Sequence, residues 1–538
     1  MSQGKGARNV FKPADISKSS GPLTTLDAER LIPLPTPYDD IASLPPRKSL
    51  DPQKVDTSLD GFSALGFSRP RTPDEKKQLV DAFVYGPKKL LDPDNNWTFL
   101  RQLRLSLDHC ARCQSCDDAC PIYEASGHDE VYRPTFRSEV FRRFVKQYAE
   151  SGGKTLAWLK GESIDLNAVA LGRLLESAYR CTLCRRCAQA CPMGIDNALL
   201  TREIRKLFSM ELGIAPKELH EKGSMLQLGT GSSTGMNARA ARDNLDFLDD
   251  EIKDQTGLTI KTPWDKEGAD ILLIHNAGEI LAWPENPMAF AIILEAAGIS
   301  WTMSSELAGY DSVNYGLWYD DAQFARVAVR QADAARKLKV KKIVLGECGH
   351  GHKASMVSGD RLLAGESNIP CESALVLLRD IVRSGRLKLD PSRNNFPVTL
   401  HDPCNMVRMM GLVEPQREIL RAICPQFREM TPHGVNNYCC GGGSGFAIMS
   451  GYNFEDWRFL VSGRKKLKQV LEAFADCPEP EKKKYVCAPC SNCKGQLRDL
   501  FRYYGVWENS GILYGGLAEL IVNAMVDAKE PFIKWEFH

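Results

Sequence analysis

The chain has 538 residues, with 69 lysines and arginines, 68 aspartates and glutamates and a formal net charge of +1. This length predicts two or three domains, and the balanced charge gives no reason to expect nucleic acid or an anionic membrane surface as a partner. The 18 cysteines stand in short groups rather than in scattered pairs. Because the N-terminus shows no secretory signal, this grouping predicts metal binding rather than a framework of disulfides.

No run of 18 apolar residues occurs in the sequence, which is the length that a membrane-spanning helix needs. We therefore expect a cytoplasmic chain without a transmembrane helix of its own, which could still dock on a membrane subunit.

Residues 1–92 are rich in proline, serine and charge, as in the stretch around Pro33, Pro35 and Pro37. Little hydrophobic periodicity is visible there, so we predict an extended arm. Two alternatives stay open for this arm: it is disordered, or it lies on partner subunits, since leucine and phenylalanine recur through it.

Residues 93–213 show helical periodicity around two copies of the pattern Cys-x2-Cys-x2-Cys-x3-Cys-Pro. The copies comprise Cys110, Cys113, Cys116 and Cys120, then Cys181, Cys184, Cys187 and Cys191. In two-cluster ferredoxins the first three cysteines of such a run bind one cluster and the fourth binds the other. We therefore assign Cys110, Cys113, Cys116 and Cys191 to one cubane 4Fe-4S cluster, and Cys181, Cys184, Cys187 and Cys120 to a second.

Two zinc sites are the alternative interpretation of these motifs, since Cys-x2-Cys pairs also bind zinc. A zinc site would leave the third cysteine and the proline of each motif unexplained. The long helical segment between the motifs indicates a helical two-cluster ferredoxin domain, which relays single electrons.

Residues 214–267 are polar and rich in glycine and serine, and we predict a linker. Short apolar strands then alternate with helices in two similar halves, residues 268–390 and 391–538. HNAG at 275–278 aligns with HDPC at 401–404, and KIVLGECGHGHK at 342–353 aligns with KYVCAPCSNCKG at 484–495. The sequence therefore predicts an α+β multidomain protein whose helical ferredoxin domain precedes a duplicated α/β domain with a cleft between its two lobes.

A second group of cysteines lies in the last half of the chain. It consists of Cys404, then Cys439 and Cys440 before a GGGSG stretch, then Cys490 and Cys493. Glycines after adjacent cysteines allow the backbone to approach closely while both thiolates bind one inorganic core. Five thiolates exceed the need of one cubane, so either an unusual single cluster or a cubane with one spare buried cysteine is possible.

These five cysteines resemble the CCG motif of heterodisulfide reductases. The resemblance implies that they hold a non-cubane 4Fe-4S cluster that cleaves a disulfide. A two-cluster ferredoxin domain ahead of two CCG repeats is similar to the D-type subunit (HdrD) of that family. With the Pro-rich arm, the layout is most similar to the K subunits (DsrK) of the DsrMKJOP membrane complex, which is linked to dissimilatory sulfite reductase.

This resemblance implies a catalytic iron–sulfur subunit at the cytoplasmic face of the inner membrane. Its implied partners are the other subunits of a redox complex, among them a cytochrome b-type membrane subunit that exchanges electrons with quinone. The implied substrate is a disulfide or trisulfide on a small sulfur-carrier protein of DsrC type. The sequence does not decide whether the carrier is reduced or oxidised, because thiol–disulfide and quinone couples can exchange electrons in either direction.

The first half departs from the motif. Gly278 stands in place of Cys404, the sequence at 309–311 replaces CCG, and Gly351 replaces Cys493. Only Cys348 aligns with a ligand, Cys490, so we expect no cluster in this half. Cys348 is either a thiol of lowered pKa that exchanges with a disulfide, or a neighbour of a proton-donating His350, or an inert remnant.

Two other functions compete with this interpretation. One is the iron–sulfur electron-transfer subunit of a flavin-dependent glycolate, lactate or glycerol-3-phosphate dehydrogenase, and the other is a non-enzymatic scaffold. The sequence has no G-x-G-x-x-G after a strand and no P-loop, so a nucleotide or flavin site is not indicated. The four other cysteines are expected to be small buried residues: Cys371, Cys424, Cys477 and Cys487. Cys487 could also form an alternative Cys-x2-Cys pair with Cys490.

Overall fold

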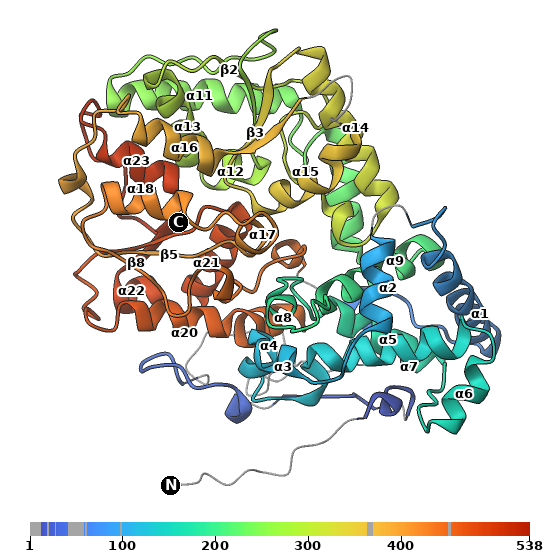
Figure 1. Cartoon of the computed structure of the whole chain (residues 1–538). Helices are drawn as coiled ribbons and strands as arrows, with labels where there is room; N and C mark the ends of the chain where they lie inside the picture. The colour runs from blue at the N-terminus through green and yellow to red at the C-terminus, as the bar shows by residue number, and fades with distance from the viewer. Residues whose placement is uncertain are drawn as a thin grey trace. The chain divides into compact units, whose positions relative to one another are not determined.

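The computed structural model describes residues 12–18, 21–26, 28–40, 59, 62–96, 99–362, 369–449 and 453–537 (Figure 1). The chain forms two compact units. The first, here the helical unit, contains Met1–Glu218, Trp318–Asp321 and Gly441–Lys468, and the second, here the α/β unit, contains Leu219–Leu317, Ala322–Cys440 and Gln469–His538. No helix among the described residues is both long and apolar enough to cross a membrane.

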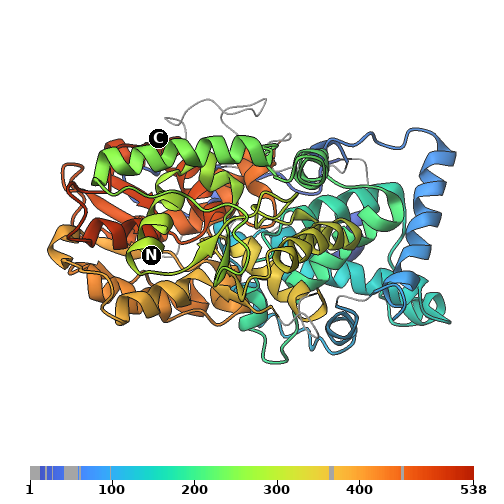
Figure 2. The same ribbon diagram turned by 90° about the horizontal axis from the view of Figure 1, so that it is seen from above.

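The helical unit is built from helices, and those over Ala168–Tyr179 and Asn197–Leu212 are buried over most of their length. Its main elements are α1 (Pro73–Leu90), α2 (Leu100–Asp108), α3 (Ser115–Asp118), α4 (Pro121–Ala125), α5 (Pro134–Tyr148), α6 (Gly153–Leu159), α7 (Ala168–Tyr179), α8 (Arg186–Gln189), α9 (Asn197–Leu212) and α19 (Phe454–Trp457). Helix α9 starts at the side-chain cap of Asp196 and ends at Gly213, whose φ of 66° closes the helix. Figure 2 shows these helices from above.

The prediction of an extended arm over residues 1–92 is wrong in its last part. Thr72 and Glu75 form a capping box, and residues 73–90 are helix α1. The earlier described residues lie on the helical unit itself: Arg173 Nη1 donates to the carbonyl of Ile16 at 2.9 Å, and Thr24 Oγ1 donates to Asp129 Oδ2 at 2.7 Å. The rest of the arm prediction falls on residues outside the described ranges.

The α/β unit contains two four-stranded parallel sheets with the same strand order, β2-β1-β3-β4 and β6-β5-β7-β8. The strands are β1 (Ile271–Ile274), β2 (Trp301–Thr302), β3 (Lys342–Leu345), β4 (Cys371–Ser373), β5 (Val398–Leu400), β6 (Phe427–Arg428), β7 (Lys484–Cys487) and β8 (Ile512–Gly515). The sequence predicts β1, β3 and β5 with these bounds. Their near-continuous apolar runs are typical of strands buried on both faces.

Helices surround these sheets. They are α10 (Leu226–Thr230), α11 (Ala238–Thr256), α12 (Ala277–Ala282), α13 (Glu285–Ala296), α14 (Asp321–Lys337), α15 (Gly349–Leu362), α16 (Ala374–Arg383), α17 (Cys404–Met409), α18 (Pro415–Ile423), α20 (Arg464–Ala473), α21 (Ser491–Tyr504), α22 (Val506–Ser510) and α23 (Leu517–Ala524). One hydrophobic core runs through both halves of the unit, with α13 packed on α23 and α16 packed on α18.

Two predicted boundaries differ from the structure. The segment predicted as a linker, 214–267, contains α11, which buries Leu245, Leu248 and Ile252 in the core of the α/β unit. The predicted second repeat, 391–538, is not one unit either, because Gly441–Lys468 belongs to the helical unit. Side chains at positions i, i+3 and i+7 form the buried stripe of α11, and many charges between them mask it in the sequence.

Candidate iron–sulfur sites

The two Cys-Pro motifs fold into loops of the same backbone shape. Arg112 and Gln114 in the first loop have φ values of 56° and 65°, and Leu183 and Arg185, at the matching positions of the second loop, have 53° and 63°. Such left-handed conformations are uncommon for residues other than glycine. Their occurrence at matching positions means that both loops are held in one conformation, which turns successive cysteines toward a common centre.

The fourth cysteine of the first motif lies with the first three of the second. Burial raises the pKa of Cys120 to about 12, and the nearby charges of Cys184 and Cys181 act in the same direction. Burial likewise raises the pKa of Cys187, and again Cys184, Cys181 and Cys120 are among the neighbours that contribute. The structure thus brings together the four residues that the sequence groups as the second cubane site.

The reciprocal group forms around Cys116. Burial raises the pKa of Cys116 to about 12, and the charges of Asp117, Cys191 and Cys110 raise it further. Asn197 Nδ2 donates to Cys116 Sγ at 3.3 Å, and the amide of Ile195 donates to Cys191 Sγ at 3.3 Å. Cys113, the other cysteine predicted for this cluster, is exposed, and its sulfur lies 3.4 Å from Ser115 Oγ. Amide donors aimed at sulfur suit thiolate ligands, whose charge they stabilise.

The second cysteine group is buried in the α/β unit. Cys404 begins α17 after strand β5, Cys490 follows β7 as the residue before α21, and Cys493 lies in the first turn of α21. Cys439 and Cys440 lie in an irregular segment, and each of the five cysteines is at most 8% exposed. Because these strands are parallel, the loops at their carboxyl ends meet at one edge of the sheet.

Hydrogen bonds join four of these thiols. Bonds with Cys439 and then Cys493 lower the pKa of Cys440, and a bond with Cys493 lowers the pKa of Cys490. Its bonds with Cys440 and Cys490 and its burial raise the pKa of Cys493. Among the described contacts none joins the Cys404 thiol to the other four thiols. The residues on either side of it, Pro403 and Asn405, nevertheless lie close to Gly349, which also contacts Cys490.

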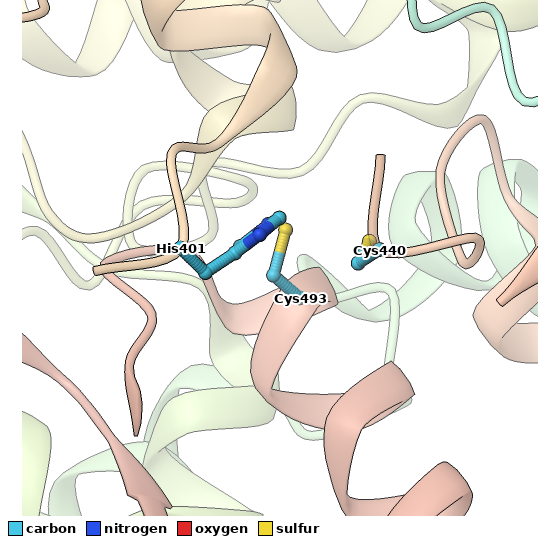
Figure 3. A group of neighbouring side chains, drawn as sticks. All are labelled: His401, Cys440 and Cys493. Atoms are coloured by element: carbon cyan, nitrogen blue, oxygen red, sulfur yellow. The ribbon is translucent and has the colours of Figure 1, made fainter. Parts of the chain in front are cut away.

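An imidazole that the sequence patterns do not assign joins this group. His401 is fully buried, and one of its ring nitrogens lies within 4.8 Å of the sulfurs of Cys440 and Cys493. Figure 3 shows these three side chains, which come from three separate segments of the chain, pointing into one space. His401 belongs to the HDPC motif, and its repetition as HNAG in the first half is the one signal that could have identified it.

Cys348 does not have the environment of a reactive thiolate. Burial raises its pKa to about 12, and the charge of Cys490 adds to this. The side-chain amide of Asn276 and the backbone amide of Gly351 lie 3.5 and 3.3 Å from its sulfur. The hypothesis of a lowered pKa is therefore wrong, because the thiol is buried among neutral donors instead of cations.

The two histidines near Cys348 point elsewhere. His350 Nδ1 lies 2.9 Å from Asn492 Nδ2, and His352 bonds the Cys348 carbonyl and Ser373 Oγ. Burial lowers the pKa of His350 to about 3 and that of His352 to about 4. Both rings are thus neutral near pH 7, and His350 is not the imidazolium that the proton-donor hypothesis requires.

The four other cysteines have structural roles. Cys424, Cys477 and Cys487 are buried as expected, whereas Cys371 is only partly buried at the edge strand β4. Cys487 is the last residue of β7 and belongs to the hydrophobic core, so it does not extend the Cys490 group. All 18 cysteines lie in described residues and none forms a disulfide.

The donor sets fit iron–sulfur clusters. Thirteen cysteines fall in three groups, two in the helical unit and one in the α/β unit, and thiolate is the ligand that such clusters use. Gly441, directly after Cys440, has a φ of 95°, and a Cβ there would lie 2.5 Å from the backbone nitrogen of Gly463. The close approach that the sequence predicts is thus found at Gly441, while Gly442 and Gly443 do not adopt positive φ.

Comparison with known proteins agrees with this division. Residues 106–195 match the family described as a 4Fe-4S dicluster domain, and residues 398–498 match the family described as a cysteine-rich domain, CCG. Together with the mixed helices and parallel sheets, these matches confirm the predicted fold class.

Several relatives extend over most of the chain. It is 27% identical over 476 residues to the Hdr-like menaquinol oxidoreductase iron-sulfur subunit 2 of Archaeoglobus fulgidus, a match that covers 79% of this chain and 81% of that protein. It is 26% identical over 401 residues to the D-type chain of the dihydromethanophenazine:CoB–CoM heterodisulfide reductase of Methanosarcina barkeri, covering 73% and 89%. The EtfAB:quinone oxidoreductase of Syntrophomonas wolfei is 23% identical over 400 residues, covering 68% and 51%.

Proposed function

We propose that this chain, an iron–sulfur oxidoreductase subunit of the heterodisulfide-reductase-like type, is the catalytic subunit of a membrane-associated redox complex. Its reaction is the reduction, or the reverse formation, of a disulfide or trisulfide on a small sulfur-carrier protein of DsrC type. Within the family we propose that it corresponds to the K subunit (DsrK) of the DsrMKJOP complex.

The observation that carries this proposal is the buried group of Cys439, Cys440, Cys490, Cys493 and His401 in a unit separate from the two-cluster loops. An electron-relay protein needs only the two-cluster loops. A further thiolate-rich centre is needed when the chain also performs chemistry on sulfur. The names of the relatives from Archaeoglobus and Methanosarcina point to the same type of reaction.

The ligand sets form part of the proposal. Cys110, Cys113, Cys116 and Cys191 hold one cubane, and Cys181, Cys184, Cys187 and Cys120 hold the other. Cys404, Cys439, Cys440, Cys490 and Cys493 hold a non-cubane 4Fe-4S cluster. When bound, these clusters supply one-electron transfer and, at the five-cysteine site, an iron centre that binds sulfur.

The protein's own residues hold this third site rigid. Asp402, between His401 and Cys404, accepts both guanidinium NH groups of Arg417 at 2.8 and 2.7 Å and the amide of Gly434 at 2.6 Å. The amide of Gly349 donates to Cys490 Sγ at 3.3 Å. A bidentate, buried ion pair fixes the loop that carries His401 and Cys404, and the amide donor stabilises negative charge on Cys490.

We further propose a cytochrome b-type membrane subunit as the electron partner and the cytoplasmic face of the inner membrane as the location. Support comes from the resemblance to K-type subunits and from the relative named as a menaquinol oxidoreductase subunit. Quinol is a membrane-soluble reductant, so a partner that exchanges electrons with it would have to be embedded in the membrane.

The holoprotein can be tested with reduced methyl viologen as electron donor. We expect viologen oxidation when a trisulfide-loaded carrier of DsrC type is added, and weaker or no oxidation with the CoM–CoB heterodisulfide. Oxidation only with the heterodisulfide would keep the reaction type and reject the carrier. No oxidation with either, from a protein with full cluster content, would contradict the catalytic role.

A second candidate is electron transfer between a flavoprotein and quinone, favoured by the similarity to the EtfAB:quinone oxidoreductase. That relative is matched over only 51% of its length, and electron transfer alone leaves the five-cysteine site unexplained. Purification from the native membrane separates the two candidates: the main proposal expects a haem b protein to co-purify, whereas the alternative expects a flavoprotein.

A further inference from the structure

Three polar side chains converge where strand β8 passes into helix α23. Gly515 and Gly516 form this junction, and neither has room for a side chain. A Cβ on Gly516 would lie 2.8 Å from Asn286 Nδ2 and 2.9 Å from Glu519 Oε1, and it would also overlap the Glu347 carboxylate. The two glycines therefore let polar side chains from three segments of the chain approach the backbone at one point.

Gly515 and Glu519 of this junction also line a surface cavity. The cavity has a volume of about 280 Å³ and is lined by Trp283, Tyr485, Tyr514, Gly515 and Glu519, among others. Tyr485 OH donates to Glu519 Oε2 at 2.9 Å, which holds that carboxylate at the inner wall. Glu519 thus faces both the cavity and the buried space at Gly516.

The Asn286 side chain shows that the space is suited to water. Asn286 is fully buried, and among the described residues neither amide atom has a hydrogen-bond partner. Its Nδ2 atom points to the space shared with Glu347 and Glu519. Buried polar atoms of this kind are usually satisfied by ordered water, so we expect water between Asn286, Glu347 and Glu519, and these three side chains are here called the passage.

Glu347 lies at the inner end of this passage. Its carboxylate accepts the amides of Leu517 and Ala518, each at 2.9 Å. The charged groups that face it are Lys494, Glu279 and Glu519, and Lys494 Nζ lies 3.4 Å from Glu279 and 3.7 Å from Glu519. Burial is the largest influence and raises the pKa of Glu347 to about 8, so this carboxyl can take up and release a proton near neutral pH.

The backbone around Glu347 contacts the five-cysteine site. Glu347 comes directly before Cys348 and Gly349, and the Gly349 amide donates to Cys490 Sγ at 3.3 Å. The backbone amide of Ser491, next to Cys490, donates to the Glu347 carbonyl at 2.8 Å. The loop that carries Glu347 therefore touches the loop that carries Cys490.

We propose that Glu519, Glu347 and the hydrated space at Asn286 carry protons between the surface cavity and the five-cysteine site. This inference rests on the proposed function, because cleavage of a disulfide consumes protons. One disulfide, two electrons and two protons give two thiols; the sulfur–sulfur bond breaks, and each sulfur gains one electron and one proton. The electrons come from the cubanes, and the protons pass from solvent to Glu519 and then to Glu347. In the reverse reaction the protons leave by the same route.

Glu519→Gln and Glu347→Gln test the route, with Glu536→Gln as the matched control. Glu536 lines the mouth of the same cavity but lies outside the buried passage. We expect both passage variants to slow viologen-driven reduction of the trisulfide carrier at least tenfold, while cluster EPR signals and the rate of cubane reduction stay unchanged. The control should match the native protein.

Infrared spectroscopy supplies a readout that does not depend on turnover. In the redox difference spectrum of the holoprotein we expect a carboxylic acid band that shifts in D₂O, persists in Glu536→Gln and is lost in Glu347→Gln. Native turnover with equal rates in all three variants would overturn the proton route and leave the proposed function standing. Absence of the band overturns the route as well. A native protein that shows the band but reduces no sulfur substrate would instead refute the proposed function.

Discussion

The two halves of the α/β unit share one strand order, β2-β1-β3-β4 and β6-β5-β7-β8, but they close the same loops in different ways. In the second half these loops carry five cysteines. In the first half Asp311 accepts the amides of Ala277, Val313 and Ser233, and the Asn276 side chain caps α12 through the amide of Gly278. Hydrogen bonds thus hold the loops of the first half, where the second half has thiolates. The first half therefore keeps the same strand order without a set of cluster ligands.

The largest effect should come from the equivalent cysteines of the two halves. Cys490→Ala should abolish the sulfur chemistry and remove about one third of the iron, because it deletes a ligand of the third cluster. Cys348→Ala, at the aligned position of the first half, should keep all the iron and most of the activity. Iron analysis and viologen-driven turnover measure both variants. Equal iron loss in the two variants would show that the cluster ligands are not confined to the second half.

A second comparison concerns the two buried aspartates that hold the loops. Asp402→Asn leaves the buried guanidinium of Arg417 with Glu429 alone of its two carboxylate partners and should lower the free energy of unfolding by about 3 kcal/mol. Asp311→Asn removes a carboxylate bonded to neutral amides and should cost about 1–2 kcal/mol. Chemical denaturation of the two holoproteins provides the measurement, and a larger loss in Asp311→Asn would contradict this ranking.

Gly441 and Gly385 are two glycines with positive φ in different surroundings, one after the Cys439–Cys440 pair and one shortly after α16. Gly385 has a φ of 68° with nothing within 4 Å of an added Cβ, so Gly385→Ala should cost about 1 kcal/mol. Gly441→Ala adds a steric clash with Gly463 to the same left-handed strain and should cost about 3 kcal/mol. Unfolding midpoints in denaturant test this difference, which would be refuted by equal costs.

A further effect is a pH dependence of stability that originates in Glu347. Burial raises its pKa from 4.5 to about 8, so the folded protein binds this proton more tightly than the unfolded chain does. Its contribution to stability is complete below pH 4.5 and is lost as the pH rises toward 8, by at most about 1.4 kcal/mol for each pH unit. Thermal unfolding across this range should therefore show a shallower decline for Glu347→Gln than for the native protein. Parallel curves would mean that Glu347 does not titrate there.

The sequence predicts those features that depend on local pattern. Strands β1, β3 and β5 follow from short apolar runs, and the shared conformation of the two-cluster loops follows from their spacing. Helix α1 escapes prediction although Thr72 and Glu75 form a capping box, because the prolines before it outweigh that signal. Helix α11 escapes prediction because charge conceals its apolar stripe.

The site could be predicted only in part for a different reason. Cysteine spacing identifies ligands, but the role of a histidine depends on which loops the sheet brings together. His401 reaches Cys440 and Cys493 only through tertiary structure. The raised pKa of Cys348 likewise results from burial, and nothing in the residues around it in the sequence indicates that.

The second half of the α/β unit should hold a redox centre distinct from the two cubanes, and the proposed function depends on that centre. Low-temperature EPR of the oxidised holoprotein, with and without a thiol substrate, tests it most directly in the native chain and in Cys490→Ala. We expect a paramagnetic signal that the thiol perturbs and that Cys490→Ala lacks, with unchanged cubane signals after reduction. If all signals are the same in both proteins, the five cysteines do not hold a separate centre.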